Sequence, residues 1–93
     1  MNVIIVDVRT PEEYGVGRIE NSINIDIKSD DFADSISSLD KSKVYFLYCN
    51  AGTRSSRARN TMKEAGFAYV FELDGGMDEW LNLAFPVVST VKN

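Results

Sequence analysis

The sequence predicts an α/β fold: a mostly parallel central sheet with helices on both of its faces. Strand-like and helix-like patterns alternate along the 93 residues, and the segments that join them are short. The length suits a single domain, residues 1–93, because two separate cores would each be too small to be stable. A hydrophobic content of 44% and a charged content of 26% are ordinary for a globular chain.

The first half of the chain contains two expected strands and two expected helices. Residues 3–8, VIIVDV, are apolar and β-branched, as in a strand covered on both faces. Residues 10–14, TPEEY, predict a short helix with a threonine N-cap, a proline at the first helical position and acids in the first turn. Residues 23–27, INIDI, alternate like a strand with one solvent face, and 29–40 begin a second helix with acidic capping residues. The apolar face of that helix is formed by Phe32, Ile36 and Leu39.

The second half repeats the alternation. Residues 44–48, VYFLY, form a short apolar run typical of a buried strand. A helix is expected after it and ends at Gly66, and residues 69–73, YVFEL, predict another strand. A last helix is expected within 75–85, GGMDEWLNLAF. The apolar faces of these two helices are formed by Ala58, Met62 and Ala65, and by Met77, Trp80, Leu81 and Ala84, respectively.

Composition limits the classes of function. The formal net charge of -4 disfavours nucleic acid as a partner. The longest apolar runs are short, such as VIIV at 3–6, so no membrane-crossing segment is expected. No basic segment followed by a long apolar stretch opens the sequence, and we therefore expect a cytoplasmic protein. One cysteine and no histidine exclude an internal disulfide and a Cys–His catalytic pair, and disfavour a zinc site.

The only cysteine, Cys49, stands where an apolar strand is expected to end. Ligands of open α/β sheets bind beyond the carboxyl ends of the strands, and the segment NAGTR connects Cys49 to the next helix. Gly52 allows a tight turn whose N–H groups point inward, and the helix adds its unpaired N–H groups and the positive end of its dipole. The loop is therefore predicted to hold a thiolate or a small anion, with the pKa of Cys49 below that of a free cysteine.

Basic residues gather around this thiol in an otherwise acidic chain. Residues 49–66 contain one acid, Glu64, against the basic residues Arg54, Arg57, Arg59 and Lys63. This cluster indicates a small anionic substrate, although a solvated basic helix face explains the charge equally well. Cys49 could also pack as a small hydrophobe. The glycine, the arginine and the paired serines that follow it favour a functional loop.

The segment CNAGTRS resembles the active-site loop of the rhodanese sulfurtransferases. Three further segments are similar to that family: IIVDVRTPEEY to its amino-terminal signature, GRIENSINI to the segment after it, and AGFAYVFELDGGMDEW with FPV to its carboxy-terminal signature. The four motifs stand in order and cover most of the chain. The resemblance implies a rhodanese-like three-layer sandwich, with a mostly parallel central sheet between helices.

The resemblance also implies a role for each position of the loop. Cys49 would be the nucleophile that takes a sulfane sulfur and becomes a persulfide. Arg54 would face an anionic donor such as thiosulfate or polysulfide, and the acceptor would be cyanide, a thiol or a protein thiol. No cofactor or metal is implied, because the sulfur travels on the protein itself. The residues that would surround the persulfide and bind substrate are Asn50, Ala51, Gly52, Thr53, Arg54 and Ser55.

Other positions of the four motifs are interpreted as structural. Asp7 and Arg9 are expected to pair near the base of the loop. Gly75 and Gly76 are expected to serve chain reversal and close helix packing, and Trp80 is expected to lie in the core.

Two departures from the family pattern lie outside the loop. The family usually has a histidine where this chain has Arg18, and a Pro-Gly pair where it has Glu20 and Asn21. We expect altered local packing there, with an effect of Arg18 on acceptor docking left open.

Loop length separates sulfur transfer from a second chemistry of this fold. Related dual-specificity phosphatases place an arginine six residues after the cysteine, whereas Arg54 is five residues after Cys49. The shorter loop suits a sulfur atom better than a tetrahedral phosphate, so phosphatase or arsenate reductase activity is the weaker enzymatic hypothesis. The sequence is also compatible with a non-catalytic binding or regulatory module and with a protein-to-protein sulfur carrier. Such binding modules commonly lack the cysteine that this chain retains.

Overall fold

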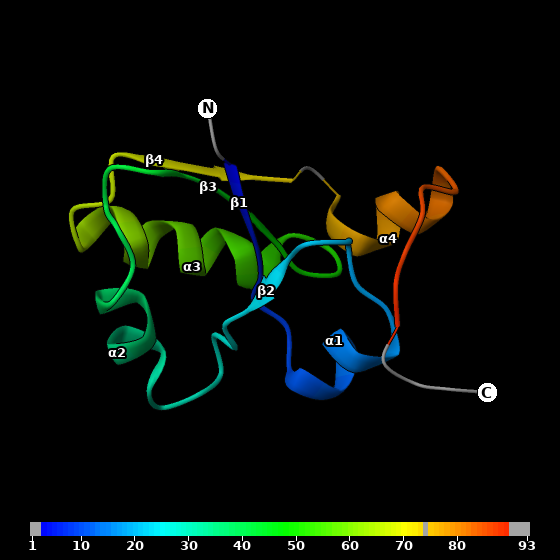
Figure 1. The fold of residues 1–93 in the computed structure, drawn as a ribbon, viewed down its shortest axis with the longest axis horizontal. Helices are drawn as coiled ribbons and strands as arrows, with labels where there is room; N and C mark the ends of the chain where they lie inside the picture. Colours follow the sequence, from blue (N-terminus) through cyan, green and yellow to red (C-terminus); the bar gives the residue numbers. More distant parts are fainter. Residues whose placement is uncertain (1–2, 74, 90–93) are drawn as a thin grey trace.

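The computed structural model describes residues 3–73 and 75–89, which form a four-stranded parallel sheet with helices on both faces (Figure 1). The elements are β1 (Val3–Asp7), α1 (Pro11–Val16), β2 (Ile23–Asn24), α2 (Phe32–Ser37), β3 (Val44–Tyr48), α3 (Thr53–Glu64), β4 (Tyr69–Glu72) and α4 (Gly76–Asn82). The strand order is β2-β1-β3-β4, and every neighbouring pair is parallel. The predicted α/β class is confirmed. Residues 1–2, 74 and 90–93 of the expected domain lie outside the described part.

The local signals placed most elements correctly. Thr10 caps α1 in a reciprocal capping box with Glu13, and Pro11 occupies the first helical position. The second strand is shorter than predicted, Ile23–Asn24 instead of 23–27. Ile25 and Ile27 still donate to carbonyls of the neighbouring chain segment, but β1 ends at Asp7 and leaves no ladder for β2 to extend.

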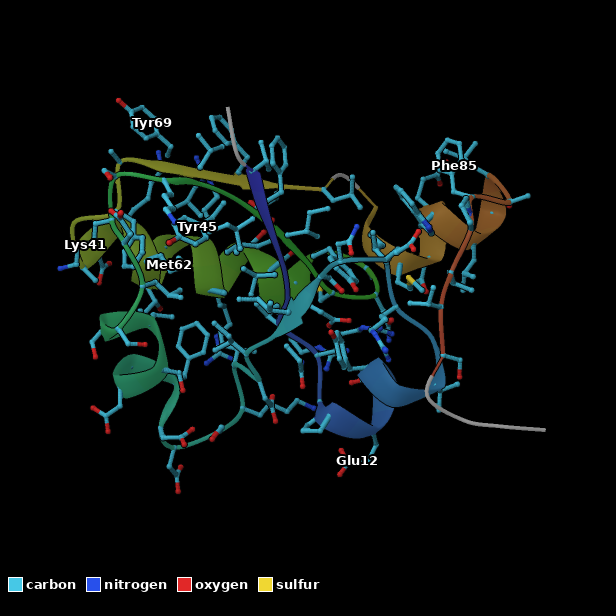
Figure 2. All side chains as sticks on the ribbon, viewed as in Figure 1. Glu12, Lys41, Tyr45, Met62, Tyr69 and Phe85 are labelled. Carbon is cyan, nitrogen blue, oxygen red and sulfur yellow. The ribbon has the colours of Figure 1, made fainter. Side chains whose placement is uncertain are left out.

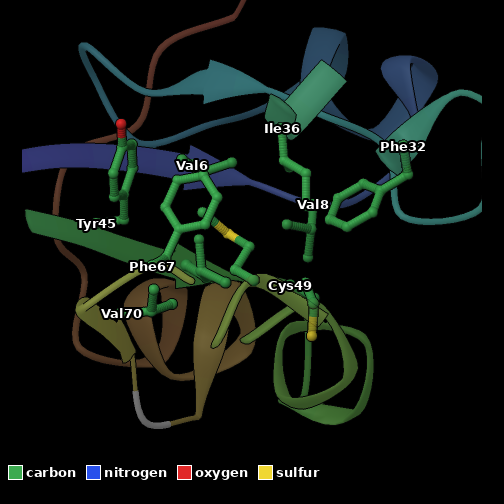
Figure 3. Packing of buried hydrophobic residues seen from close by; sticks show 11 residues of the cluster. Val6, Val8, Phe32, Ile36, Tyr45, Cys49, Phe67 and Val70 are labelled. Carbon is green, nitrogen blue, oxygen red and sulfur yellow. The ribbon is translucent and has the colours of Figure 1, made fainter. Parts of the chain in front are cut away.

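One face of the sheet packs against α2 and α3 and carries most of the core. Tyr45 and Leu47 of β3 point to this face and are fully buried, and Tyr45 meets Phe67 edge to face at 5.5 Å. Met62 of α3 is also buried in this layer, and Figure 2 shows Tyr45 and Met62 on the opposite side of the sheet from Tyr69. The buried cluster consists of Val6, Val8, Phe32, Ile36, Tyr45, Leu47, Cys49, Ala58, Met62, Phe67 and Val70 (Figure 3).

The other face is covered only in part. Met77 of α4 packs with Ile19 and Tyr48, and Trp80 lies half-buried beside them. No helix within residues 3–73 and 75–89 covers the rest of this face, and its exposed large side chains include Val3, Phe46, Tyr69 and Phe71.

Three residues that were predicted to face inward are exposed, and two more, Leu39 and Trp80, are only partly buried. Leu81 and Ala84 are exposed, because α4 ends at Asn82 and the chain then turns back, with Ala84 at a φ of 59°. Ala65 is exposed, because it caps the end of α3 instead of continuing its inner face. Trp80 lies at the edge of the core, where its Nε1 donates to the Pro86 carbonyl at 2.8 Å across the returning chain.

The described residues contain no helix that is both long and apolar enough to span a membrane.

Candidate active site

The central position of β3 determines what surrounds Cys49. The strand lies between β1 and β4, and the parallel register pairs Tyr48 with Asp7 and Leu47 with Glu72. Because parallel strands end at the same edge, Asp7 and Glu72 flank the loop that follows Cys49 on opposite sides. Residues far apart in the sequence are thereby brought to one thiol.

The loop wraps backbone amides around the Cys49 sulfur. The N–H of Gly52 donates to Sγ at 3.0 Å and the N–H of Ser55 at 3.4 Å, while the thiol donates to the Ser55 hydroxyl at 3.5 Å. Figure 3 shows Cys49 at the edge of the buried cluster, beside the start of α3. Gly52 makes this turn possible, because its φ of 103° is strained for any residue with a Cβ.

These contacts favour the ionised sulfur. Cys49 is only 1% exposed, and burial alone would raise the pKa of its thiol. Hydrogen bonding with the Ser55 hydroxyl and with the N–H groups of Ser55, Gly52 and Arg54 outweighs the burial, so the pKa of Cys49 lies below its usual value. The start of α3 adds the positive end of a twelve-residue helix.

Arg54 is bound by a carboxylate from α1. Its Nη1 and Nη2 donate to the two oxygens of Glu13 at 2.7 and 3.0 Å. Asn50 adds a third bond, from Nδ2 to Glu13 Oε2 at 2.7 Å. Hydrogen bonding to Arg54 holds the pKa of Glu13 far below its usual range, and Glu13 in turn raises the pKa of Arg54. Glu13 therefore fastens α1 to the loop at two points.

A second ion pair lies beneath the loop. Arg9 Nη2 lies 2.7 Å from Asp7 Oδ2, and the two side chains are 5% and 0% exposed. The same guanidinium donates to Asn50 Oδ1 at 3.2 Å and to the Gly17 carbonyl at 2.6 Å. This arrangement pairs the buried charges and hydrogen-bonds the side chain of Asn50 to Arg9.

A third carboxylate, Glu72, lies on the other flank of the loop. Its Oε1 accepts a hydrogen bond from the Ser56 hydroxyl at 2.7 Å and a longer one from the Ser55 hydroxyl at 3.3 Å. Ser55 has a further acceptor in the Gly52 carbonyl, at 3.1 Å. The hydroxyl that contacts the Cys49 thiol thus also contacts a charged group.

The start of α4 packs directly on the backbone of the loop. The N–H of Met77 donates to the Cys49 carbonyl at 2.7 Å, and the N–H of Asp78 donates to the Asn50 carbonyl at 3.0 Å. A Cβ on Gly76 would lie 2.2 Å from the Cys49 carbonyl oxygen. Only glycine permits this approach.

Two hollows open beside the loop. One, of about 480 Å³, lies between α1 and α4 and is lined mostly by apolar atoms, with Arg9, Glu13 and Asn50 on its polar side. The other, of about 390 Å³, is polar. Its lining consists of Ala51, Gly52, Thr53, Ser56, Glu72, Leu73 and Gly75. Within residues 3–73 and 75–89, no cluster of side chains is suited to hold a metal ion.

The predicted basic cluster does not converge on the thiol. Arg54 alone of its basic members joins the hydrogen-bond network of the loop; Arg57 and Lys63 are exposed, and Arg59 Nε donates to the Val70 carbonyl at 3.4 Å. Sequence reasoning missed Glu13 and Glu72 as neighbours of the loop. Along the chain Glu13 is only a first-turn acid and Glu72 only a strand residue, and no local signal connects either to Cys49.

The structure describes both positions at which the sequence departs from the family pattern. Arg18 pairs with Val88 in an isolated antiparallel bridge, and its guanidinium lies 4.5 Å from the centre of the Tyr14 ring. Asn21 takes a positive φ of 67° in the following turn.

Solved structures of similar fold match nearly the whole chain. The Rhodanese_3 like domain of the Alr3790 protein from Anabaena sp. superposes with a TM-score of 0.86 at 31% identity, covering 99% of this chain and 97% of that one. A rhodanese from E. coli, solved with anions, gives a TM-score of 0.73 at 31% identity, covering 95% and 99%. Fold and site together define an α/β protein whose single described cysteine lies in a loop of inward-pointing amides.

The chain belongs to the rhodanese-like domain family, whose model matches residues 1–83. It is 34% identical over 83 residues to thiosulfate sulfurtransferase PspE of Escherichia coli, covering 89% of this chain and 76% of that protein. It is 37% identical over 79 residues to the tRNA uridine(34) hydroxylase of Cytophaga hutchinsonii. The chain spans only about a quarter to a third of the length of the tRNA uridine(34) hydroxylases that it matches.

Proposed function

We propose that this protein is a sulfurtransferase that carries a sulfane sulfur on Cys49. The observation that carries the proposal is the pair of N–H groups, from Gly52 and Ser55, that point at the Cys49 sulfur. Such donors stabilise a thiolate, and they would stabilise the negative terminal sulfur of a persulfide in the same way. The likeness to a thiosulfate sulfurtransferase supports the same chemistry.

The reaction consists of two displacements at sulfur. In the first, the Cys49 thiolate attacks the outer sulfur of thiosulfate or polysulfide; a new S–S bond forms, the S–S bond of the donor breaks, and sulfite or a shortened polysulfide leaves with the electron pair. In the second, cyanide, a thiol or a protein thiol attacks the outer sulfur of the persulfide. The Cys49 thiolate is then the leaving group, so the thiolate-stabilising amides assist both steps.

Mass spectrometry of the intact protein tests the proposal. After exposure to thiosulfate or polysulfide, we expect the mass to increase by one sulfur atom, at Cys49, and to return to its original value when cyanide is added. A folded protein that gains no sulfur from either donor would favour a non-catalytic binding module. Recovery of the sulfur on a second protein, with none on cyanide, would favour a protein-to-protein carrier.

A further inference from the structure

The charged groups of the described part of the site nearly cancel one another. Arg9 is neutralised by Asp7 and Arg54 by Glu13, and these are the two ion pairs found within residues 3–73 and 75–89. Glu72 contacts the hydroxyls of the loop but forms no ion pair within the same ranges. Of the charged side chains that hydrogen-bond to loop residues, Arg9 and Arg54 are each matched by a carboxylate, whereas Glu72 is matched by no cation of the described residues.

Glu13 acts directly on the residue expected to attract an anion. Each terminal nitrogen of Arg54 gives one N–H to a Glu13 oxygen, so the charge of the guanidinium is paired, although its other N–H groups remain available. Asp26 adds a longer-range attraction to the same guanidinium. A donor that approaches Arg54 therefore meets a cation whose charge is already neutralised by a carboxylate held through two charge-assisted bonds.

Glu72 acts from the opposite flank. It shares the Ser55 hydroxyl with the Cys49 thiol, and it lines the polar hollow beside Gly52 and Thr53. A dianion that approaches the sulfur from this hollow meets a negative charge that no cation of the described residues neutralises. The loop amides offer only partial positive charges against it.

We propose that this site selects an organic persulfide without a second negative charge as its sulfur donor, over the dianion thiosulfate, because Glu13 and Glu72 cancel the positive charge of the loop. The inference rests on the proposed sulfurtransferase function. The step remains balanced: the Cys49 thiolate attacks the outer sulfur of R–S–SH, the S–S bond of the donor breaks, and RS⁻ leaves while Cys49 becomes a persulfide.

Two persulfide donors that differ in the charge of their substituent separate the effect of donor charge from the effect of the sulfur chemistry. Cysteamine persulfide carries an ammonium group and 3-mercaptopropionate persulfide carries a carboxylate, but both present the same reacting sulfur. Single-turnover loading of Cys49 is followed by mass spectrometry for both, with thiosulfate as a third donor. We expect the ammonium-bearing donor to load fastest, and we expect the ratio of the two persulfide rates to fall as added salt screens the carboxylates.

The variants Glu13→Gln and Glu72→Gln test the assignment to these residues. Each variant removes one negative charge and replaces the carboxylate by an amide of the same shape that can still hydrogen-bond. We expect each to raise loading by thiosulfate and by 3-mercaptopropionate persulfide about three- to tenfold relative to cysteamine persulfide. Glu64→Gln is the matched control, because it removes the same charge from the exposed far end of α3 and should leave the donor ratio unchanged.

The outcomes separate this inference from the proposed function. Equal loading by the two persulfides, or a donor ratio unchanged in both variants, overturns charge selection while leaving sulfur transfer intact. No loading by any of the three donors overturns both. If Glu13→Gln loosens α1, Glu72→Gln still decides the test, because the hydrogen bonds of Glu72 are with Ser55 and Ser56 of α3.

Discussion

Arg54 is held by both carboxylate oxygens of Glu13, at 2.7 and 3.0 Å, although the two residues are 41 positions apart. The pair joins the first turn of α3 to α1, and both side chains are partly exposed, 19% and 29%. A substitution at either residue therefore changes both the charge beside Cys49 and the anchoring of its loop.

Replacing Cys49 by serine should abolish sulfur transfer and preserve the fold. A hydroxyl is a far poorer nucleophile than a thiol at neutral pH, and serine is close to cysteine in size. Thiocyanate production from thiosulfate and cyanide measures transfer, and circular dichroism provides the control for folding. Near wild-type turnover by a folded Cys49→Ser protein would show that the mechanism is wrong.

Alkylation of Cys49 should follow a pKa below that of a free cysteine. Burial opposes ionisation, but the Ser55 hydroxyl and the amides of Ser55, Gly52 and Arg54 lower the pKa by a larger amount. The rate of iodoacetamide labelling should therefore reach its plateau at a lower pH than that of a model thiol. Ser55→Ala should move the plateau to higher pH, because Cys49 loses its hydrogen bond with the Ser55 hydroxyl, which lowers the pKa of the thiol. A labelling curve that matches the model thiol would contradict this account of the loop.

Replacing Arg54 by alanine should slow persulfide formation from thiosulfate by about ten- to a hundredfold. The change removes a cation and leaves Glu13 unpaired beside the donor. Arg54→Lys should recover only part of the rate, because lysine lacks the planar fork. Arg57→Ala is the matched control, since Arg57 is exposed on the same helix; its effect should be small and should fade with salt. A larger loss in Arg57→Ala than in Arg54→Ala would reverse the assignment.

Replacing Glu13 by glutamine should lower the free energy of unfolding at neutral pH by about 0.5–1 kcal/mol, as expected for a partly exposed pair. Because Arg54 lowers the pKa of Glu13 in the folded state, this stabilisation is complete above the unfolded-state pKa of about 4.3. It is lost as the pH falls from there toward the lower folded-state pKa. Urea unfolding of both proteins at neutral pH and at low pH measures the difference, which should shrink in acid. A gap that widens in acid would show that the ion pair does not stabilise the fold.

Replacing Gly76 by alanine should destabilise the protein by about 2–4 kcal/mol. The new Cβ would meet the Cys49 carbonyl at 2.2 Å, and the φ of 55° would be strained as well. Gly17→Ala is the control, because Gly17 has an extended backbone and its nearest side-chain atom would be 3.9 Å away. Thermal unfolding of the two variants compares them, and an unchanged melting temperature for Gly76→Ala would contradict the packing of α4 on the loop.

The elements that sequence predicted well are those whose signals are local. Thr10, Pro11 and Glu13 determine the start of α1 through contacts within one helical turn. Gly52 marks the turn at Cys49, because its left-handed backbone is a local property of the chain. The apolar run of β3 likewise predicted a buried strand without any knowledge of its neighbours.

The burial of apolar side chains could not be predicted in this way, because it depends on which surfaces pack together in the folded chain. Leu81 and Ala84 follow a helical pattern, yet they are exposed, because the chain turns back after α4 and leaves that surface without a partner. The open face of the sheet has the same origin: Phe46 and Phe71 stack at 5.4 Å, but no helix of the described chain covers them. Periodicity shows that a face is apolar and not what will cover it.

The sequence by itself determined the class of fold, the position of the only thiol at the end of a strand, and the amide-rich turn that follows it. Only the tertiary structure decided the charge of the site. Parallel pairing of β3 with β1 and β4 brings the strand ends together, and the placement of α1 then adds Glu13 to Arg54, while β4 adds Glu72 to the serines of α3. The physical reason is that charges act through space: the basic cluster counted along residues 49–66 includes its own neighbours but not the carboxylates that folding brings to them.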